Sequence, residues 1–292
     1  MKINISCAVL LAAYNGENWI EEQIQSILKQ KNIDVHIYVS LDISNDSTIE
    51  ILKKIIVKDK RVILLPYGEK FGNAAKNFYR LIKDVDFSNY DFISLSDQDD
   101  IWKENKLNNS WNVIKENKYA AFSSNVLAFW PNGKKKLIKK SQPQVKYDYF
   151  FESAGPGCSF AIKIHLALNL KKFLIDNYSQ CQNIDLHDWL IYAYSRYNDY
   201  KWHISDEPLI LYRQHQSNYI GARVGLKAYR YRLKKVLGKW YKEEIRKIYR
   251  CVTGNENDII LKKKWLFRNI YNLRRRNMDK ILLTMLIVFN LL

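Results

Sequence analysis

Short apolar runs alternate with amphipathic segments over the first third of the chain, and this alternation restricts the possible folds more than any other feature. The runs cover residues 5–13, 35–41, 61–66 and 91–96, and segments with apolar residues at helical spacing separate them. Apolar runs of this length are typical of strands buried on both faces, as in parallel sheets. The order strand, helix, strand therefore predicts an α/β fold with a mostly parallel, doubly wound sheet.

Each of these runs ends in polar residues. Parallel strands have their carboxyl ends at one edge of the sheet, and open α/β sheets bind ligands at that edge. Tyr14, Asp42 and Asp97 directly follow or end separate runs. We therefore expect these three side chains to lie near one another, although they are far apart in sequence.

The segment Ser96-Asp97-Gln98-Asp99-Asp100 places three carboxyl groups within four residues at the end of the fourth run. Such a cluster is electrostatically unfavourable unless a cation neutralises it. Carboxylate oxygens suit Mg²⁺ or Mn²⁺, which bind through one or two carboxylates together with substrate phosphates. The competing interpretation is an acidic turn in which Asp100 caps the following helix or orients Trp102.

Positive charge is concentrated at the end of the chain. The formal net charge is +17, of which residues 227–292 contribute +13 and residues 1–226 only +4. Apolar and aromatic residues recur at helical spacing among these lysines and arginines, which is typical of a helix on an anionic membrane surface. We therefore predict a globular domain over residues 1–225 and a basic amphipathic helical tail over 226–292 that associates with a membrane surface.

The apolar segment 281–292 is shorter than the roughly 20 residues that a membrane span needs. It is compatible with dipping into a bilayer, with packing on a partner subunit in a homodimer, or with a place in the core. The amino-terminal segment superficially resembles a signal peptide. A first strand is the preferred interpretation, because the segment carries one charge and a patterned helix follows.

The four cysteines are far apart in sequence and form no CxxC pair; they are Cys7, Cys158, Cys181 and Cys251. This spacing favours neither a zinc site nor a disulfide framework. It suits buried thiols in a reducing compartment.

An ordered set of motifs resembles a known family. The motifs are Ala12-Ala13-Tyr14-Asn15-Gly16-Glu17, Asp42-x-Ser44-x-Asp46-x-Thr48, Gly72 with Asn77-Phe78, Ser96 to Trp102, Gly157-Cys158, His187-Asp188-Trp189, and Tyr212 to Asn218 with Gly221. Together they resemble the family 2 glycosyltransferases with the GT-A fold, in the bacterial rhamnosyltransferase-like branch that builds surface polysaccharides. The resemblance covers residues 5–221.

The resemblance implies a GT-A fold, with a Rossmann-like, mostly parallel sheet flanked by helices. Residues 1–102 would bind the nucleotide sugar and residues 103–225 the acceptor. The implied enzyme is inverting and uses Mn²⁺ or Mg²⁺. It would transfer a sugar from a UDP- or dTDP-sugar to a lipid-linked oligosaccharide, for capsule, O-antigen or cell-wall polysaccharide. That acceptor implies a peripheral location on the cytoplasmic face of the cell membrane.

The resemblance also assigns roles to individual residues. The nucleotide-sugar-binding residues are Ala12, Tyr14, Asn15, Glu17, Asp42, Asp97 and Arg213; the metal ligands are Asp99 and His215; the catalytic base is Asp188; and the acceptor-binding residues are Gly157, Cys158, His187 and Trp189. Here Leu41 replaces the acid that usually precedes Asp42.

The chemistry supports these roles independently. The acceptor hydroxyl must lose a proton as it attacks, which requires a general base such as Asp188, and direct displacement would invert the anomeric centre. The competing role of Asp188 is to cap its own helix.

Three other functions compete with glycosyl transfer. The basic tail permits nucleic-acid binding, but the charge lies outside the motif-bearing domain, so no nucleic acid is expected. Paired aspartates also serve metal-dependent nucleotidyl or phosphoryl transferases, although the chain has no GxxxxGK loop. A non-catalytic sugar-nucleotide binder is the third. The sequence leaves open the donor, the acceptor, the linkage and the oligomeric state.

Overall fold

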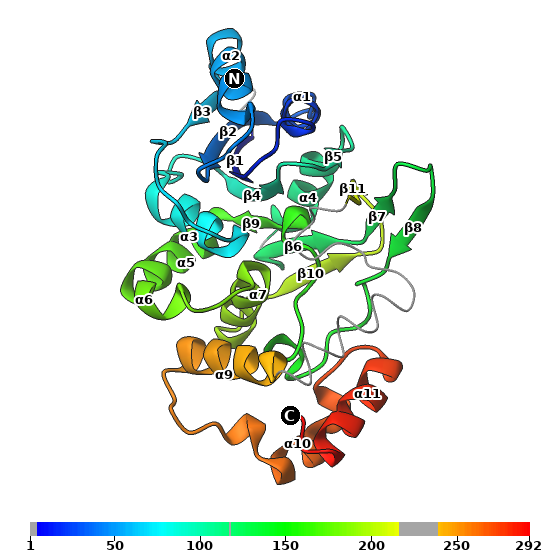
Figure 1. Cartoon of the computed structure of the whole chain (residues 1–292). Helices are drawn as coiled ribbons and strands as arrows, with labels where there is room; N and C mark the ends of the chain where they lie inside the picture. Colours follow the sequence, from blue (N-terminus) through cyan, green and yellow to red (C-terminus); the bar gives the residue numbers. More distant parts are fainter. Residues whose placement is uncertain (1–4, 117, 216–238) are drawn as a thin grey trace.

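The computed structural model describes residues 5–116, 118–215 and 239–292 (Figure 1). Its centre is a seven-stranded sheet with the order β10-β6-β9-β4-β1-β2-β3. The strands are β1 (Ser6–Ala13), β2 (Asp34–Leu41), β3 (Val62–Leu64), β4 (Phe92–Asp97), β6 (Ala121–Ser124), β9 (Ala161–Lys163) and β10 (Trp202–Ser205). Only β9 runs antiparallel to its neighbours, β4 and β6. The predicted mostly parallel α/β sheet is confirmed.

Strand β1 faces a hydrophobic core on each side of the sheet. Ala8, Leu10 and Ala12 belong to one core, and the intervening residues Cys7, Val9, Leu11 and Ala13 belong to the other. Successive side chains of a strand point to opposite faces. This burial on both faces explains why the sequence of β1 is apolar without alternation.

The helices cover the two faces in separate groups. The core around Val9 includes residues of α1 (Ile20–Leu28), α2 (Thr48–Lys58) and α4 (Lys106–Ile114). The core around Leu10 includes residues of α3 (Ala74–Asp84), α5 (Ile164–Asp176) and α7 (His187–Tyr197). Short helical segments complete the domain: η1 (Asp148–Phe150), η2 (Gly157–Ser159) and α6 (Tyr178–Cys181).

The apolar segment 119–130 contains two strands that belong to different sheets. After β6, the chain enters a second sheet of order β5-β11-β7-β8, built from β5 (Ile101–Trp102), β7 (Val126–Phe129), β8 (Lys135–Ile138) and β11 (Ile210–Arg213). Asn125 lies at the switch, where its Nδ2 donates to the Asp206 carbonyl (2.9 Å) and its Oδ1 accepts from the Lys140 amide (2.6 Å). A continuous apolar pattern cannot reveal this change of partner.

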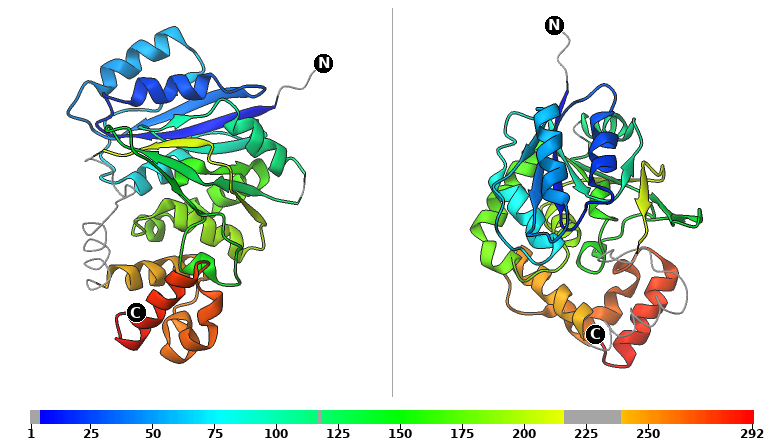
Figure 2. Two further views of the ribbon diagram at one scale, coloured as in Figure 1. Left: turned by 90° about the vertical axis from the view of Figure 1, so that its right-hand side faces the viewer. Right: turned by 45° about the horizontal axis from the view of Figure 1, so that its top comes forward.

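The C-terminal region consists of α9 (Trp240–Thr253), η3 (Ile259–Leu261), α10 (Lys263–Asn269), η4 (Ile270–Asn272) and α11 (Asn277–Val288), at the opposite end of the molecule from α2 (Figures 1 and 2). Ile245 and Ile248 of α9 are fully buried in the core that also contains α7. The apolar face of α9, expected on a membrane, therefore packs against the domain. Residues 216–238, with motif positions Asn218 and Gly221, lie outside the described residues.

Helix α11 is apolar on both of its faces. Leu283, Leu286 and Ile287 pack into the core, whereas Met278, Ile281, Leu282, Met285, Val288 and Phe289 are about half exposed or more. Within the described ranges, no helix is both long enough and apolar enough to cross a membrane. One face of this segment therefore belongs to the core, and the other face is exposed.

Candidate active site

The carboxyl ends of β1, β2 and β4 lie side by side, as the sequence predicts. Ala12 is paired in register with Asp97, the last residue of β4, and Ala13 is paired with Leu41. This register brings the loops after Ala13 and Leu41 to the edge where β4 ends. Ala12 and Asp97 therefore share one edge of the sheet with the loops that carry Tyr14, Asn15, Glu17 and Asp42, whereas Arg213 lies on β11 of the second sheet.

Two loops at this edge are joined by side-chain hydrogen bonds. Asn15, with a left-handed φ of 47°, accepts from the Asn45 amide through Oδ1 (2.9 Å), and Glu17 accepts from the Ser47 amide (3.0 Å). The backbone amide and carbonyl of Tyr14 are both bonded to the side chain of Gln98 (2.8 and 2.6 Å). Tyr14 is 52% exposed, so it is accessible to a ligand.

Asp42 holds the loop that precedes α3. Its carboxylate accepts from the backbone amides of Ile43 (2.9 Å), Phe71 (2.9 Å) and Gly72 (2.8 Å). Gly72 has a φ of +80°, a conformation that favours glycine. Asp42 therefore shapes this corner of the edge through the backbone that it binds.

The acidic segment forms a dense carboxyl cluster. One oxygen each of Asp97 and Asp100 and the sulfur of Cys158 lie within 4.8 Å of one another, and Asp100 and Cys158 are fully buried. Burial, together with the charges of Asp99 and Asp188, raises the pKa of Asp97 to about 7. Burial and the neighbouring aspartates also raise the pKa of Asp100 well above its usual range.

A divalent cation would relieve this repulsion, because it stabilises the ionised carboxylates. The carboxylates fit Mg²⁺ or Mn²⁺. Cys158 does not contribute as a hard ligand, since burial and the carboxyl groups raise the pKa of its thiol well above the ordinary value and keep it protonated.

The two residues predicted as metal ligands are in direct contact. His215 Nε2 lies 2.7 Å from Asp99 Oδ2, and the His215 ring stacks on Trp19 at a centroid distance of 3.9 Å. Both side chains are only 12% exposed. The structure thus brings together two residues separated by more than a hundred positions, as a shared ligand role requires.

Arg213, the last residue of β11, holds the acidic turn of Asp99 and Asp100 against that strand. Its backbone amide donates to Asp100 Oδ1 (3.1 Å), its Nε donates to the Asp99 carbonyl (2.9 Å), and its guanidinium pairs with Glu22. The helix-capping role considered for Asp100 is wrong: α4 begins at Lys106 with Asn105 as its N-cap residue, and β5 lies between. Asp100 instead fastens the turn to β11.

Asp188 lies in the first turn of α7, close enough to the acidic cluster to raise the pKa of Asp97. Its Oδ1 accepts from the adjacent Trp189 amide (2.8 Å). Burial raises the pKa of Asp188 to about 6, although the Trp189 amide, the Ser153 hydroxyl and Lys140 oppose the shift. The N-cap position of the helix belongs to Leu186, so Asp188 does not cap it.

His187 is held in a tight, neutral environment. Its ring stacks on Phe78 at 4.0 Å, and its Nε2 has no hydrogen-bonding partner among the described residues. Burial lowers the pKa of His187 to about 3. A Cβ atom added at Gly157 would lie only 2.4 Å from that Nε2. Gly157 therefore permits a close approach that no other residue allows.

Trp189, predicted to bind the acceptor, belongs to the core. It is 3% exposed, its Nε1 donates to the Tyr149 carbonyl (2.9 Å), and its ring stacks near Tyr241 of α9 at 5.7 Å. The buried indole anchors the first turn of α7, which also carries Asp188. It leaves little of the indole for contact with an acceptor.

Sequence reasoning missed two polar residues of the site. Gln98 lies inside the acidic motif, and the sequence analysis assigns it no role. Its side-chain amide nevertheless bonds both backbone polar groups of Tyr14. Lys106 is fully buried, with its ammonium 3.4 Å from the Trp102 ring centroid and 2.8 Å from Ser94 Oγ. Burial lowers the pKa of Lys106 to about 7. A lysine in an amphipathic helix gives no sequence signal of burial.

Comparison with known proteins identifies the family of the chain. The family model for "Glycosyl transferase family 2" matches residues 8–173. The chain is 43% identical over 288 residues to the dTDP-rhamnosyl transferase RfbG of Shigella flexneri, covering 96% of this chain and 100% of that protein. It is also 27% identical over 163 residues to the Escherichia coli UDP-Glc:alpha-D-GlcNAc-diphosphoundecaprenol beta-1,3-glucosyltransferase WfgD, covering 56% of this chain and 61% of that one.

Solved structures share the fold. S. aureus TarS 1-349 in complex with UDP-GlcNAc superposes with a TM-score of 0.55 at 15% identity, covering 91% of this chain and 80% of TarS. The mannosyltransferase PcManGT from Pyrobaculum calidifontis, in complex with GDP-Man and Mn²⁺, gives 0.52 at 14% identity, covering 84% and 69%. With the family match and the near full-length relative, these findings show that the chain is a glycosyltransferase of family 2, of the rhamnosyltransferase-like kind.

Proposed function

We propose that this glycosyltransferase is an inverting, metal-dependent enzyme that transfers a sugar from a nucleoside-diphosphate sugar to a lipid-linked glycan during bacterial surface polysaccharide synthesis. The observation that carries the proposal is the arrangement of Asp188 beside the acidic cluster of Asp97, Asp99 and Asp100. The proposed base comes from the first turn of α7, whereas the three carboxyl groups of the cluster come from the end of β4 and the turn that follows it. The competing phosphoryl-transfer and nucleic-acid functions have no comparable support.

In this proposal, Asp188 accepts the proton of the attacking acceptor hydroxyl. Its pKa of about 6 keeps it mostly ionised near neutral pH while leaving it basic enough to take a proton. His187, neutral and fixed against Phe78, orients the first turn of α7. Attack on the face opposite the diphosphate would invert the anomeric centre.

Asp99 and His215 would hold the divalent cation, with Mn²⁺ or Mg²⁺ favoured by the carboxylates of the acidic turn, and Asp97 would bind the nucleotide sugar. When bound, the cation would neutralise the diphosphate that leaves the sugar. Tyr14, Asn15, Glu17 and Asp42 would form the nucleotide side of the edge with Ala12, and Gly157 and Cys158 would border the acceptor side. Arg213 would keep the acidic turn in place.

A dTDP-sugar, with rhamnose as the sugar, is our first choice of donor, and a UDP-sugar is the second. The near full-length relative is named as a dTDP-rhamnosyl transferase. Relatives of lower identity are named as transferring glucose from UDP-Glc to a diphosphoundecaprenol-linked acceptor. These names support a nucleotide donor and a polyprenyl-diphosphate glycan as acceptor.

A lipid-linked acceptor fits attachment to the inner face of the cell membrane. The exposed apolar stripe of α11 offers a surface for this, and its flank carries Lys280. Exposed apolar side chains with a cation beside them favour binding to the surface of an anionic bilayer. We assign the membrane contact to this stripe, because α9 buries its own apolar face.

The test is a donor screen with purified protein. Binding and slow hydrolysis of dTDP-rhamnose, UDP-glucose, UDP-GlcNAc and GDP-mannose are measured with Mn²⁺ or with a chelator. We expect Mn²⁺-dependent binding of one donor, and loss of that binding in Asp99→Ala. Asp86→Asn, an exposed acid distant from the carboxyl edge, is the matched control and should bind as the unaltered protein does. Metal-independent binding, or no binding of any donor, would contradict the proposal.

A further inference from the structure

Lys140 is a partly buried cation near the proposed base, and none of the roles assigned above uses it. Its positive charge lowers the pKa of Asp188. Its side chain packs beside Gly155, because a Cβ atom added at that glycine would lie 3.6 Å from Lys140 Cγ. Gly155 is two residues from Gly157, which borders the acceptor in the proposed function. Lys140 therefore lies next to the place where an acceptor would bind.

Other cations surround Lys140. Burial lowers the pKa of Lys140 to about 8; Glu152 opposes this shift, and the charges of Arg274, Arg275 and Arg276 add to it. An anion bound beside Lys140 would favour its charged form. The charge around this lysine thus suits a negatively charged ligand.

Arg274 and Arg275 already have carboxylate partners. Arg275 pairs with Glu152 (3.2 Å) and with Asp148 (3.6 Å). Arg274 pairs with Asp279 (3.2 Å) and lies 3.7 Å from Glu152. The carboxylates of this region therefore hold the two arginines that join the C-terminal helices to the domain.

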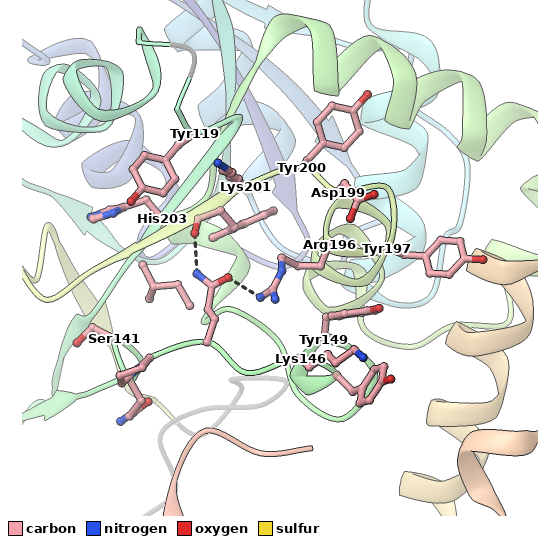
Figure 3. Close-up of a pocket in the computed structure, with 16 residues that line it drawn as sticks. Tyr119, Ser141, Lys146, Tyr149, Arg196, Tyr197, Asp199, Tyr200, Lys201 and His203 are labelled. Carbon is pink, nitrogen blue, oxygen red and sulfur yellow. Dashed lines mark hydrogen bonds between the residues drawn. The ribbon is translucent and has the colours of Figure 1, made fainter. Parts of the chain in front are cut away.

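Arg196, at the last turn of α7, takes a further share of Asp148. It pairs with that carboxylate (3.2 Å), and it donates to Tyr192 Oη (2.7 Å) and to the side chain of Gln144, beside a cavity of about 910 Å³ (Figure 3). Asp148 therefore serves two guanidinium groups.

Lys140 and Arg276 differ from these arginines, because neither forms an ion pair with any residue that the structure describes. Arg276 is exposed, and its Nη2 donates to the carbonyl of Lys139, the residue before Lys140. The two cations are thus neighbours, since the charge of Arg276 also acts on Lys140. Arginine and lysine side chains placed together without carboxylate partners suit phosphate groups.

The two cations also connect the proposed membrane contact to the proposed base. Arg276 is the N-cap residue of α11, whose exposed apolar stripe is the proposed membrane contact. Lys140 acts on Asp188. The order is therefore apolar stripe, two cations and base. A polyprenyl-diphosphate glycan has its parts in the matching order of lipid, diphosphate and sugar.

We propose that Lys140 and Arg276 bind the diphosphate of the lipid-linked acceptor and thereby position its sugar at Asp188. This inference rests on the proposed function and adds to it the residues that recognise the charged part of the acceptor. The two residues act by binding and orientation, and the proton still goes to Asp188.

The test is calorimetric titration of the full chain with geranyl diphosphate, a short polyprenyl diphosphate, in the presence of a chelator and without donor. We expect binding at or below ~1 mM. The affinity should fall about tenfold or more in the double variant Lys140→Gln, Arg276→Gln, which loses both charged partners of the diphosphate. Lys140→Arg, Arg276→Lys keeps both charges and should retain binding.

The matched control is Lys54→Gln, Lys264→Gln, which removes two exposed lysines, one on α2 and one on α10, and should bind as the unaltered protein does. The thermal unfolding midpoint of each variant shows whether the fold is kept. Absence of geranyl diphosphate binding, or an unchanged affinity in the double glutamine variant, would overturn the proposal. So would an unchanged affinity combined with weaker binding to anionic phospholipid vesicles, which would assign the two cations to lipid headgroups.

Asp99→Ala separates this inference from the proposed function. That variant should lose Mn²⁺-dependent donor binding but keep its affinity for geranyl diphosphate, because the two ligands would occupy different sites. The titration contains neither donor nor metal, so its failure is distinguishable from a failure of glycosyl transfer. Loss of geranyl diphosphate binding in Asp99→Ala would place the diphosphate at the acidic cluster and contradict the inference.

Discussion

Asp188 differs from an ordinary surface carboxyl group because the surrounding protein removes it from water. Burial raises its pKa to about 6, so the free enzyme should lose the ionised base as the pH falls through this value. We expect kcat/KM to decrease about tenfold per pH unit below pH 6. A pH profile of kcat/KM with a fixed donor and acceptor measures this. A profile that stays flat down to pH 5 would contradict the base assignment.

Replacing Asp188 tests the same role without changing the pH. Asp188→Asn keeps the size and polarity of the side chain but cannot accept the proton, so kcat should fall about 10²–10⁴-fold. Donor binding should remain, because the proposed role of Asp188 is on the acceptor and not on the donor. Donor affinity measured by calorimetry is the control, and a combined loss of donor binding and turnover would indicate a structural role.

Gly157 provides a second test at the scale of one residue. The added methyl group of Gly157→Ala would meet His187 Nε2 at 2.4 Å and push the ring away from Phe78. We expect a stability loss of about 1–3 kcal/mol, measured by urea unfolding, and a reduced kcat. If the clash is the cause, adding His187→Ala should recover part of the lost stability. An equal or larger loss in the double variant would contradict it.

Helix α11 shows the difference between pattern and packing at the scale of an element. Its sequence is apolar all round, which is typical of a fully buried helix, yet Met285 and Phe289 are 51% and 71% exposed. An exposed stripe of this kind marks an interaction surface.

We expect Leu282→Glu, Met285→Glu to weaken binding to vesicles containing anionic phospholipid by about tenfold or more. Cosedimentation with vesicles measures this. The matched control is Val57→Glu, because Val57 is 72% exposed on α2 at the other end of the molecule (Figure 1). Unchanged vesicle binding, combined with dissociation of a dimer in sedimentation, would assign the stripe to a subunit interface.

At the scale of the whole molecule, buried ion pairs join the C-terminal helices to the catalytic domain. Arg275 is fully buried at its side chain and pairs with Glu152 (3.2 Å) and Asp148 (3.6 Å), while its Nη2 donates to the Ser153 carbonyl. The Ser153 hydroxyl in turn lowers the pKa of Asp188 and so opposes the effect of burial. The C-terminal helices therefore brace the segment beside the proposed base.

Removing one member of such a buried network leaves uncompensated charges. We expect Arg275→Ala to lower the free energy of unfolding by about 3–5 kcal/mol, as measured by urea denaturation. Arg268→Ala, at an exposed arginine of α10, should change it by less than about 0.5 kcal/mol. A similar small effect of both substitutions would show that the C-terminal helices are not coupled to the stability of the domain.

The sequence alone determined the α/β class, the order of the first strands and helices, and the edge at which Tyr14, Asp42 and Asp97 meet. These features follow from hydrophobic period and strand direction, which are local properties of the chain. The resemblance added the base and metal assignments, and its family is confirmed by the match over residues 8–173.

The folded chain, and not its local pattern, fixes which residues pack together across long separations in sequence. The division of 121–129 between two sheets, the burial of Lys106, the contact of His215 with Asp99 and the packing of α9 on α7 all depend on partners far away in sequence. The hydrophobic period shows which face of a helix or strand is apolar, but it does not specify which residues that face contacts. The amphipathic helix α9 therefore buries its apolar face against the domain, whereas α11, which is apolar all round, buries one face and leaves the other half exposed.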